Sequence, residues 1–221
     1  MENVIKILKT EYITHDVKCL KLEKPKEYSF TPGQSTYLSI NKPEWENKKR
    51  PFSFTGLNTL DYLEFTIKIY PEHQGVTRQI EKLQIGEELK ISDPFGTISY
   101  KGKGVFIAAG SGITPFMAIL RQLYNEKKIK GNLLIDINKT SEDVIYGNEL
   151  HKILGIQFFS FLTRENTIGF NEKKITEDNL KEIIRNFSQF FYLCGPEKFV
   201  FEIGNLLKKL GAESEKIVIE L

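Results

Sequence analysis

The sequence has few of the residues that bind metals or form cross-links. Its 221 residues include 2 cysteines and 3 histidines. Cys19 and Cys194 are far apart, and the histidines are scattered without ligand spacing. An iron–sulfur cluster needs about four cysteine ligands, and a structural zinc site needs about four ligands as well. We therefore expect no metal site, and no disulfide if the chain is cytosolic.

Long hydrophobic runs and a large net charge are also missing. No apolar run reaches the roughly 20 residues of a membrane helix, and the first residues do not follow a signal-peptide pattern. The 31 basic and 29 acidic residues leave a formal net charge of +2, so no strongly basic surface for nucleic acid is indicated. We predict a cytoplasmic protein with no membrane span and no nucleic-acid partner, and the oligomeric state stays open.

An apolar stretch near the middle of the chain carries the first functional signal. Residues 105–109 have no charge and predict a strand buried on both faces. Gly110 and Gly112 follow, and Pro115 suits the first turn of a helix. A strand, a glycine turn and a helix amino terminus together can bind a phosphate. Pro115 stands where the dinucleotide fingerprint has its third glycine, so this motif alone also fits an ordinary strand-to-helix turn.

The first half of the chain predicts an antiparallel β-barrel. Residues 4–100 read as short strands separated by glycine and proline turns. One helix interrupts the series, with Thr77 as its expected N-cap, and gives a second candidate phosphate site. Residues 98–100 are expected to complete the barrel, and residues 101–104 to link it to the next domain.

The second half predicts a doubly wound parallel sheet. Strands are expected near 105–109, 133–137, 157–162, 190–193 and 216–221, with helices between them. One of these helices should begin at a Thr176 cap and run to Phe187. Such a sheet binds its ligand at the carboxyl ends of its strands. The residues at these ends are Gly110, Asn138, Thr163 and Cys194.

Four separated stretches together resemble the ferredoxin–NADP reductase superfamily. They are residues 50–53, 75–77, 110–115 and 194–196, and they occur in the order that this superfamily has. The resemblance spans nearly the whole chain. It implies a two-domain fold, with an N-terminal antiparallel FAD-binding β-barrel at residues 1–101 and a C-terminal NAD(P)-binding α/β domain, a doubly wound parallel sheet, at residues 102–221.

The resemblance places FAD along the barrel. Its pyrophosphate is expected between Arg50 and the helix that begins near Thr77, because an arginine fork binds phosphate oxygens in pairs. Ser53 is expected to hydrogen-bond near the reactive flavin N5, and Phe52, where the superfamily more often has tyrosine, to pack against the flavin. The FAD-binding residues implied in this way are Arg50, Pro51, Phe52, Ser53, Lys68, Gly75, Val76 and Thr77.

The resemblance also implies a nicotinamide dinucleotide site, with Cys194 beside the nicotinamide. The Thr163–Arg164 pair resembles the superfamily's phosphate-binding Ser–Arg pair, which favours NADPH over NADH. Alternatively, Lys139 and Arg164 are simply exposed. The dinucleotide-binding residues implied in this way are Gly110, Gly112, Thr114, Pro115, Thr163, Arg164, Gly195 and Pro196.

The implied reaction passes hydride from NAD(P)H to FAD and then electrons to a separate acceptor, such as a ferredoxin, a flavodoxin, an oxygenase component or a small molecule. Ser53 and Cys194 are the expected catalytic residues. Lys48 and Lys49 are candidates to meet an acidic carrier, and we expect no aromatic ring of residues 219–221 on the flavin. Two alternatives stay open: a non-catalytic FAD-binding electron-transfer or regulatory subunit of a larger complex, and a free-flavin reductase.

Overall fold

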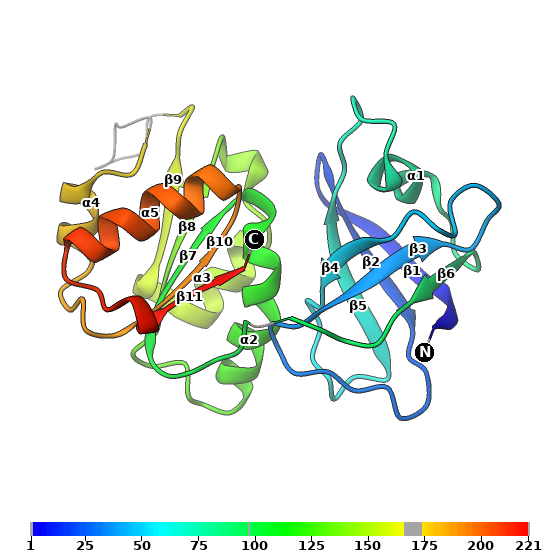
Figure 1. Ribbon diagram of the computed structural model, residues 1–221, viewed down its shortest axis with the longest axis horizontal. Coiled ribbons are helices and arrows are strands. Elements are labelled where there is room, and N and C mark those ends of the chain that lie inside the picture. The colour runs from blue at the N-terminus through cyan, green and yellow to red at the C-terminus, as the bar shows by residue number, and fades with distance from the viewer. Residues whose placement is uncertain (1, 97, 166–173, 221) are drawn as a thin grey trace. The chain divides into compact units, whose positions relative to one another are not determined.

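The computed structural model describes residues 2–96, 98–165 and 174–220 and divides the chain into two compact units. The first unit holds Met1–Ser99 together with Thr114–Gln122, and the second holds Tyr100–Ile113 and Leu123–Leu221. Each unit is described by itself below (Figure 1). Leu221, on which part of the C-terminal expectation falls, lies outside the described residues.

The first unit is built on an antiparallel sheet with the strand order β4-β3-β6-β1-β2-β5. An isolated antiparallel bridge between Phe54 and Phe65 joins its two end strands, and this bridge closes the barrel. The predicted barrel is therefore confirmed, although no strand forms at residues 98–100. The strands are β1 (Asn3–Thr14), β2 (Val17–Glu23), β3 (Ser35–Ile40), β4 (Arg50–Ser53), β5 (Tyr62–Lys68) and β6 (Glu88–Ile91).

The short helix α1 (Val76–Lys82) lies at one end of the barrel (Figure 1). Val76 and Ile80, one helical turn apart, are buried in the barrel core. Gly75 is the N-cap residue and makes no side-chain cap bond, so the prediction that Thr77 caps this helix is wrong. The core contact of Val76 sets where the helix begins, and this places Thr77 inside it.

The second unit is built on a parallel sheet with the order β11-β10-β7-β8-β9. It confirms the predicted doubly wound half. The strands are β7 (Gly104–Ala109), β8 (Leu133–Asn138), β9 (Phe158–Leu162), β10 (Phe190–Cys194) and β11 (Ile217–Glu220). The α-helices in the described second half of the sequence are α2 (Thr114–Asn125), most of which groups with the first unit, α3 (Gly147–Leu154), α4 (Glu177–Ile183) and α5 (Glu197–Lys209). The 3-10 turns are η1 (Gly110–Ile113), η2 (Ser141–Asp143), η3 (Gly155–Gln157) and η4 (Ser214–Lys216).

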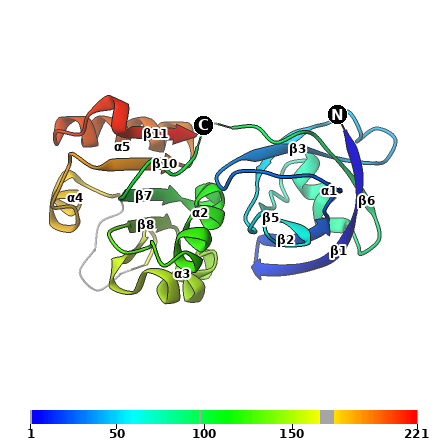
Figure 2. The ribbon, with the colours of Figure 1, turned by 90° about the horizontal axis from the view of Figure 1, so that it is seen from below.

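Helices α4 and α5 cover one face of this sheet, and α5 crosses it in Figure 1. Their buried residues form one core with alternate residues of β7, β8 and β10. Helix α3 lies on the opposite face, where the His151 ring meets Phe158 at 4.7 Å between centroids. Figure 2 shows the strands of this sheet running in one direction. Their carboxyl ends therefore share one edge.

Two expectations about α4 can be compared with the structure. Thr176 caps this helix as predicted, and the structure adds a capping box, in which the side chains of Thr176 and Asn179 each accept a hydrogen bond from the other's backbone N–H. The helix ends at Ile183, however, and not at Phe187. Ile184 is extended, with φ −104° and ψ 114°, and its side chain is buried in the core of the second unit. Burying this side chain takes the backbone out of the helix.

Candidate functional site

The predicted FAD motif forms strand β4, an end strand of the barrel sheet, which pairs with β3. Ser53 lies opposite Ser35, and their hydroxyl oxygens are 3.1 Å apart. Ser35 also exchanges two backbone hydrogen bonds of 2.8 Å with Phe95. The predicted catalytic hydroxyl of Ser53 is thus held against a backbone that is fixed from both sides.

An aromatic pair beside this motif was missed by the sequence reasoning. Tyr37 lies opposite Pro51 on β3, and its ring stacks on Phe95 with centroids 4.5 Å apart. Tyr37 is 43% exposed, so the pair offers an apolar surface next to Pro51. The alternation of Ser35, Tyr37 and Ser39 on one side of β3 is the sequence signal that could have indicated it.

Arg50 and Phe52 differ in what they can offer to a cofactor. Arg50 is exposed, donates to the Lys49 carbonyl over 2.8 Å, and forms no ion pair with any residue that the structure describes. Its guanidinium therefore keeps donors for a phosphate. Phe52 is half-buried and packs against the barrel core. Part of its ring is thus used by the fold, and the remaining part is open to a ligand.

The other predicted FAD residues extend from the last residue of β5 to the first turn of α1. The ammonium group of Lys68 lies 2.7 Å from a carboxylate oxygen of Asp16, which neutralises much of its charge. A Cβ added to Gly75 would meet nothing within 4 Å, so the backbone there faces open space. Val76 is buried and offers a ligand only its backbone, and Thr77 is half-buried. These features fit a phosphate that is bound by backbone N–H groups.

Two predicted dinucleotide motifs meet at the carboxyl edge of the parallel sheet. A Cβ added to Gly112 would lie 2.3 Å from the carbonyl oxygen of Cys194 and 2.8 Å from the nitrogen of Gly195. Only glycine fits so close to this peptide. Gly110, by contrast, has φ +55° and open space around it, as a loop that receives a ligand requires. Cys194 is half-buried at the end of β10.

The helix that follows this loop begins as predicted. After the 3-10 turn η1, helix α2 starts at Thr114, and Pro115 lies in its first turn, where its missing N–H has no helical acceptor to lose. Thr114 is half-buried and Pro115 is buried. Gly195 is also packed closely, because a Cβ there would lie 3.0 Å from the Cβ of Ala109. Pro196 is exposed at the start of α5.

The ends of β8 and β9 are tied together by backbone hydrogen bonds. The Asn138 carbonyl accepts from the Thr163 backbone N–H over 2.9 Å and from its hydroxyl over 3.2 Å. Arg164 is exposed and without an ion pair in the described part of the chain. Glu165 instead accepts a 3.1 Å hydrogen bond from the Ser141 backbone N–H. Among the described residues, Arg164 therefore keeps its charge for a ligand beside an acid that is already bonded.

The two candidate lysines for an acidic carrier are partly engaged. Lys49 forms an ion pair with Glu2, and the Lys48 ammonium lies 4.1 Å from the centroid of the Trp45 ring. Both lysines are exposed. Surface contacts of this kind are worth little individually, so both side chains remain available to a partner.

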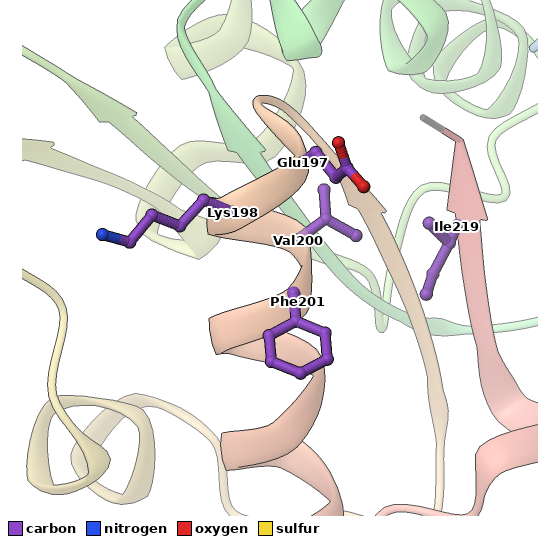
Figure 3. Close-up of a pocket in the computed structure, with 5 residues that line it drawn as sticks. All are labelled: Glu197, Lys198, Val200, Phe201 and Ile219. Carbon is purple, nitrogen blue, oxygen red and sulfur yellow. The ribbon is translucent and has the colours of Figure 1, made fainter.

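An apolar pocket of about 390 Å³ lies between α5 and β11 (Figure 3). Ile219 points from β11 towards the helix, and the Phe201 ring is 70% exposed. None of the predicted site residues lines it. The residues that line it are Glu197, Lys198, Val200, Phe201 and Ile219.

No helix in the described ranges has both the length and the apolar character that a bilayer crossing requires.

Comparison with known proteins agrees with this geometry. The sequence model of the family described as "Oxidoreductase FAD-binding domain" matches residues 4–100, and that of "Oxidoreductase NAD-binding domain" matches residues 106–203. The chain is 27% identical over 222 residues to the ferredoxin–NAD(P)(+) reductase component of the naphthalene 1,2-dioxygenase system of Pseudomonas putida. That match covers 96% of this chain and 66% of the relative.

Two solved structures share the fold. The flavohem-like FAD/NAD-binding domain of nitric oxide dioxygenase from Vibrio cholerae matches with a TM-score of 0.86 at 20% identity, over 98% of this chain and 97% of that one. A ferredoxin NADP+ reductase from Neisseria gonorrhoeae, with bound FAD and NADP, matches with a TM-score of 0.84 at 21% identity, over 99% and 98%.

The fold and the matched domains define a two-domain oxidoreductase with one FAD-binding and one NAD-binding domain. The chain belongs to the ferredoxin–NADP reductase superfamily. It spans between 46% and 66% of the length of four curated relatives that it matches.

Proposed function

We propose that this protein is an FAD-dependent NAD(P)H oxidoreductase that passes electrons from bound FAD to a separate acceptor. The observation that carries the proposal is the contact of Gly112 with the Cys194–Gly195 peptide. It joins two separated dinucleotide motifs at the carboxyl edge of a parallel sheet, where such sheets bind nucleotides. The matched FAD-binding and NAD-binding domains supply the two partners of a hydride transfer.

The residues of the barrel would bind and orient FAD. The flavin, when bound, accepts hydride and releases electrons one or two at a time. Arg50 and the backbone N–H groups at the start of α1 would bind the pyrophosphate, because Arg50 has no carboxylate partner in the described part of the chain. Ser53, held by Ser35, would donate a hydrogen bond near the reactive edge of the ring.

The residues of the second domain would bind the nicotinamide dinucleotide. Gly110 and the amino terminus of α2 would bind its pyrophosphate, since Gly110 leaves open space for a ligand. Cys194 would contact the nicotinamide from the end of β10. Arg164 supports NADPH over NADH, because its exposed guanidinium is free to bind a 2′-phosphate.

The acceptor is proposed by analogy with the relatives. The matched relatives include the reductase components of a naphthalene 1,2-dioxygenase system and of a propane 2-monooxygenase. An oxygenase component or its ferredoxin is therefore the favoured acceptor. A non-catalytic electron-transfer subunit and a free-flavin reductase are the alternatives, and the spectroscopic test described next distinguishes both from the proposed enzyme.

The direct test is an absorbance spectrum of the purified protein, followed by anaerobic addition of NADPH or NADH. Flavin bands that bleach with one of the two nucleotides would support the oxidoreductase. A stoichiometric flavin that neither nucleotide bleaches would favour the non-catalytic subunit, and a flavin lost on dilution would favour the free-flavin reductase. A protein that takes up no FAD and oxidises neither nucleotide would overturn the proposal.

A further inference from the structure

A buried acid and a buried amide lie on the same face of β8. Asp136 is 0% exposed and Asn138 is 5% exposed. They are two positions apart in the strand, so their side chains leave the same face of the sheet. Asn138 donates its side-chain N–H to Asp136 Oδ2 over 2.8 Å. This is the one hydrogen bond of the Asp136 side chain in the described part of the chain.

The other oxygen atoms of the two side chains have no partner. Asp136 Oδ1 and Asn138 Oδ1 are both buried and accept no hydrogen bond from any residue that the structure describes. A carboxylate in this position would keep a full charge with a single hydrogen bond, which is very unfavourable in an apolar interior. A neutral carboxylic acid avoids the cost of the charge and adds a donor.

The described residues next to Asp136 in the sheet and in the adjoining turn include no cation that would stabilise a carboxylate. Ala108 and Ser160 flank Asp136 in register on β7 and β9, and neither side chain carries a charge. Turn η1, which packs against β8, consists of Gly-Ser-Gly-Ile. Cys194, on β10, shares the face two strands away.

The charged residues of helix α3 are also accounted for. None of the charged or titratable residues of α3, the helix on this face, bonds Asp136: they are Glu149, His151 and Lys152. Within the described part of the chain, no opposite charge is therefore bonded to the Asp136 carboxyl.

We propose that Asp136 is a positioning residue that stays buried beside Asn138 as a neutral acid, and that its lack of charge keeps the carboxyl end of β8 closed in the conformation that receives the dinucleotide. The proposal rests on the proposed function in one respect, namely that the dinucleotide binds at this edge of the sheet. The claim that the Asp136 carboxyl is protonated does not depend on that function.

The connection from the acid to the site runs through Asn138. Its backbone carbonyl accepts both hydrogen bonds of Thr163, and the next carbonyl, of Lys139, accepts from the Arg164 backbone N–H over 2.8 Å. A displacement of Asn138 would therefore move the turn that carries Thr163 and Arg164. Both were predicted from the sequence to bind the dinucleotide.

The titration of the carboxyl agrees with the geometry. Burial raises the pKa of Asp136 from 3.8 to about 7, and the hydrogen bond from Asn138 lowers it only in part. The folded protein thus keeps a proton that the unfolded chain releases above pH 3.8. Raising the pH towards 7 removes stability, and above 7 the carboxyl ionises in place.

The first test measures amide hydrogen exchange at Thr163 in the FAD-loaded protein, corrected for the intrinsic dependence on pH. Protection of this amide should fall by about tenfold between pH 6 and pH 8.5, because a charged Asp136 is unfavourable when buried and favours opening of the end of β8 to water. Asp136→Asn keeps the shape and cannot ionise, so its protection should not change over this range. Asp178→Asn, an exposed acid of α4, is the matched control and should behave like the wild type.

Equal pH dependence of Thr163 protection in the wild type and in Asp136→Asn would overturn the proposal. A second measurement needs no variant. The infrared spectrum of the wild type should show a protonated carboxyl band at pH 6 that disappears towards pH 8.5, and its absence at pH 6 would also overturn the proposal.

Titration with NADP+ and, separately, NAD+ tests the link to the dinucleotide. Binding of the preferred nucleotide should weaken severalfold from pH 6 to pH 8.5 in the wild type but not in Asp136→Asn. Identical weakening in both proteins would contradict the positioning role. If neither nucleotide binds at any pH, the proposed function fails, and the exchange and infrared results still decide whether Asp136 carries the proton.

Discussion

A Cβ on Gly112 would lie 2.3 Å from the carbonyl oxygen of Cys194. These residues are far apart in the sequence, and each belongs to a motif that was selected independently. Their contact brings the glycine turn after β7 against the end of β10, at the edge where a parallel sheet binds its ligand. The candidate dinucleotide site therefore depends on a backbone-to-backbone contact.

Gly112→Ala tests this contact. The added methyl group cannot be accommodated without moving the Cys194–Gly195 peptide, so we expect a loss of about 1–3 kcal/mol in the free energy of unfolding and a higher KM for the nucleotide. Gly204→Ala, in α5, is the control. A Cβ there would lie 3.8 Å from the Leu193 side chain, which is an ordinary van der Waals contact. Urea unfolding of both variants checks the difference, and equal stabilities would contradict the packing argument.

Arg50→Ala tests the FAD phosphate site. Because Arg50 is exposed and its guanidinium bonds only the Lys49 carbonyl among the described residues, the substitution should leave unfolding in the absence of FAD unchanged. The dissociation constant of FAD should rise by about tenfold to a hundredfold, as expected for a lost charge-assisted hydrogen bond. Arg185→Ala, which removes an exposed arginine from the other unit, is the control. An unchanged FAD affinity would exclude Arg50 from the site.

Lys18→Met tests how α1 is held on the barrel. The ammonium group of Lys18 is buried and donates to the backbone carbonyls of Glu81, over 2.6 Å, and Leu83, over 3.1 Å. Methionine leaves both carbonyls at the end of α1 without this donor, so the free energy of unfolding should fall by about 1–3 kcal/mol. Lys9→Met removes an exposed lysine of β1 and should change it by less than about 0.5 kcal/mol. If denaturant unfolding gave the same small change for Lys18→Met as for Lys9→Met, the carbonyls of Glu81 and Leu83 would have found other donors, and the prediction would be wrong.

Arg164→Ala tests the choice of nucleotide. If the free guanidinium binds the 2′-phosphate, the ratio of kcat/KM for NADPH to that for NADH should fall by about tenfold or more. Lys152→Ala, on the exposed side of α3, should leave the ratio unchanged. A ratio that stays the same in Arg164→Ala would mean that the exposed arginine has no part in nucleotide selection.

Much of the architecture could be predicted because its causes are local. The short-range signals that form in the structure as expected are the uncharged strand at residues 105–109, the glycine turn, Pro115 in the first turn of a helix and the Thr176 cap. The change from alternating strands to strands and helices also predicted the change from an antiparallel to a parallel sheet.

The errors and omissions have tertiary causes. The start of α1 is set by the burial of Val76 in the barrel, and the end of α4 by the burial of Ile184 in the core of the second unit. The ion pair of Lys68 with Asp16 joins β5 to the turn between β1 and β2, and the sequence did not reveal that β2 and β5 are neighbours. The isolation of Asp136 depends on what surrounds it in three dimensions, so its place inside a strand was visible from the sequence and its consequence was not.

The most direct test of the account follows flavin bleaching by rapid anaerobic mixing with nicotinamide nucleotide deuterated at the transferred position. If hydride passes from the nicotinamide to FAD bound in this protein, bleaching should be severalfold slower with the deuterated nucleotide. Bleaching at the same rate with either isotopologue, and no faster than free FAD is reduced under the same conditions, would contradict the account.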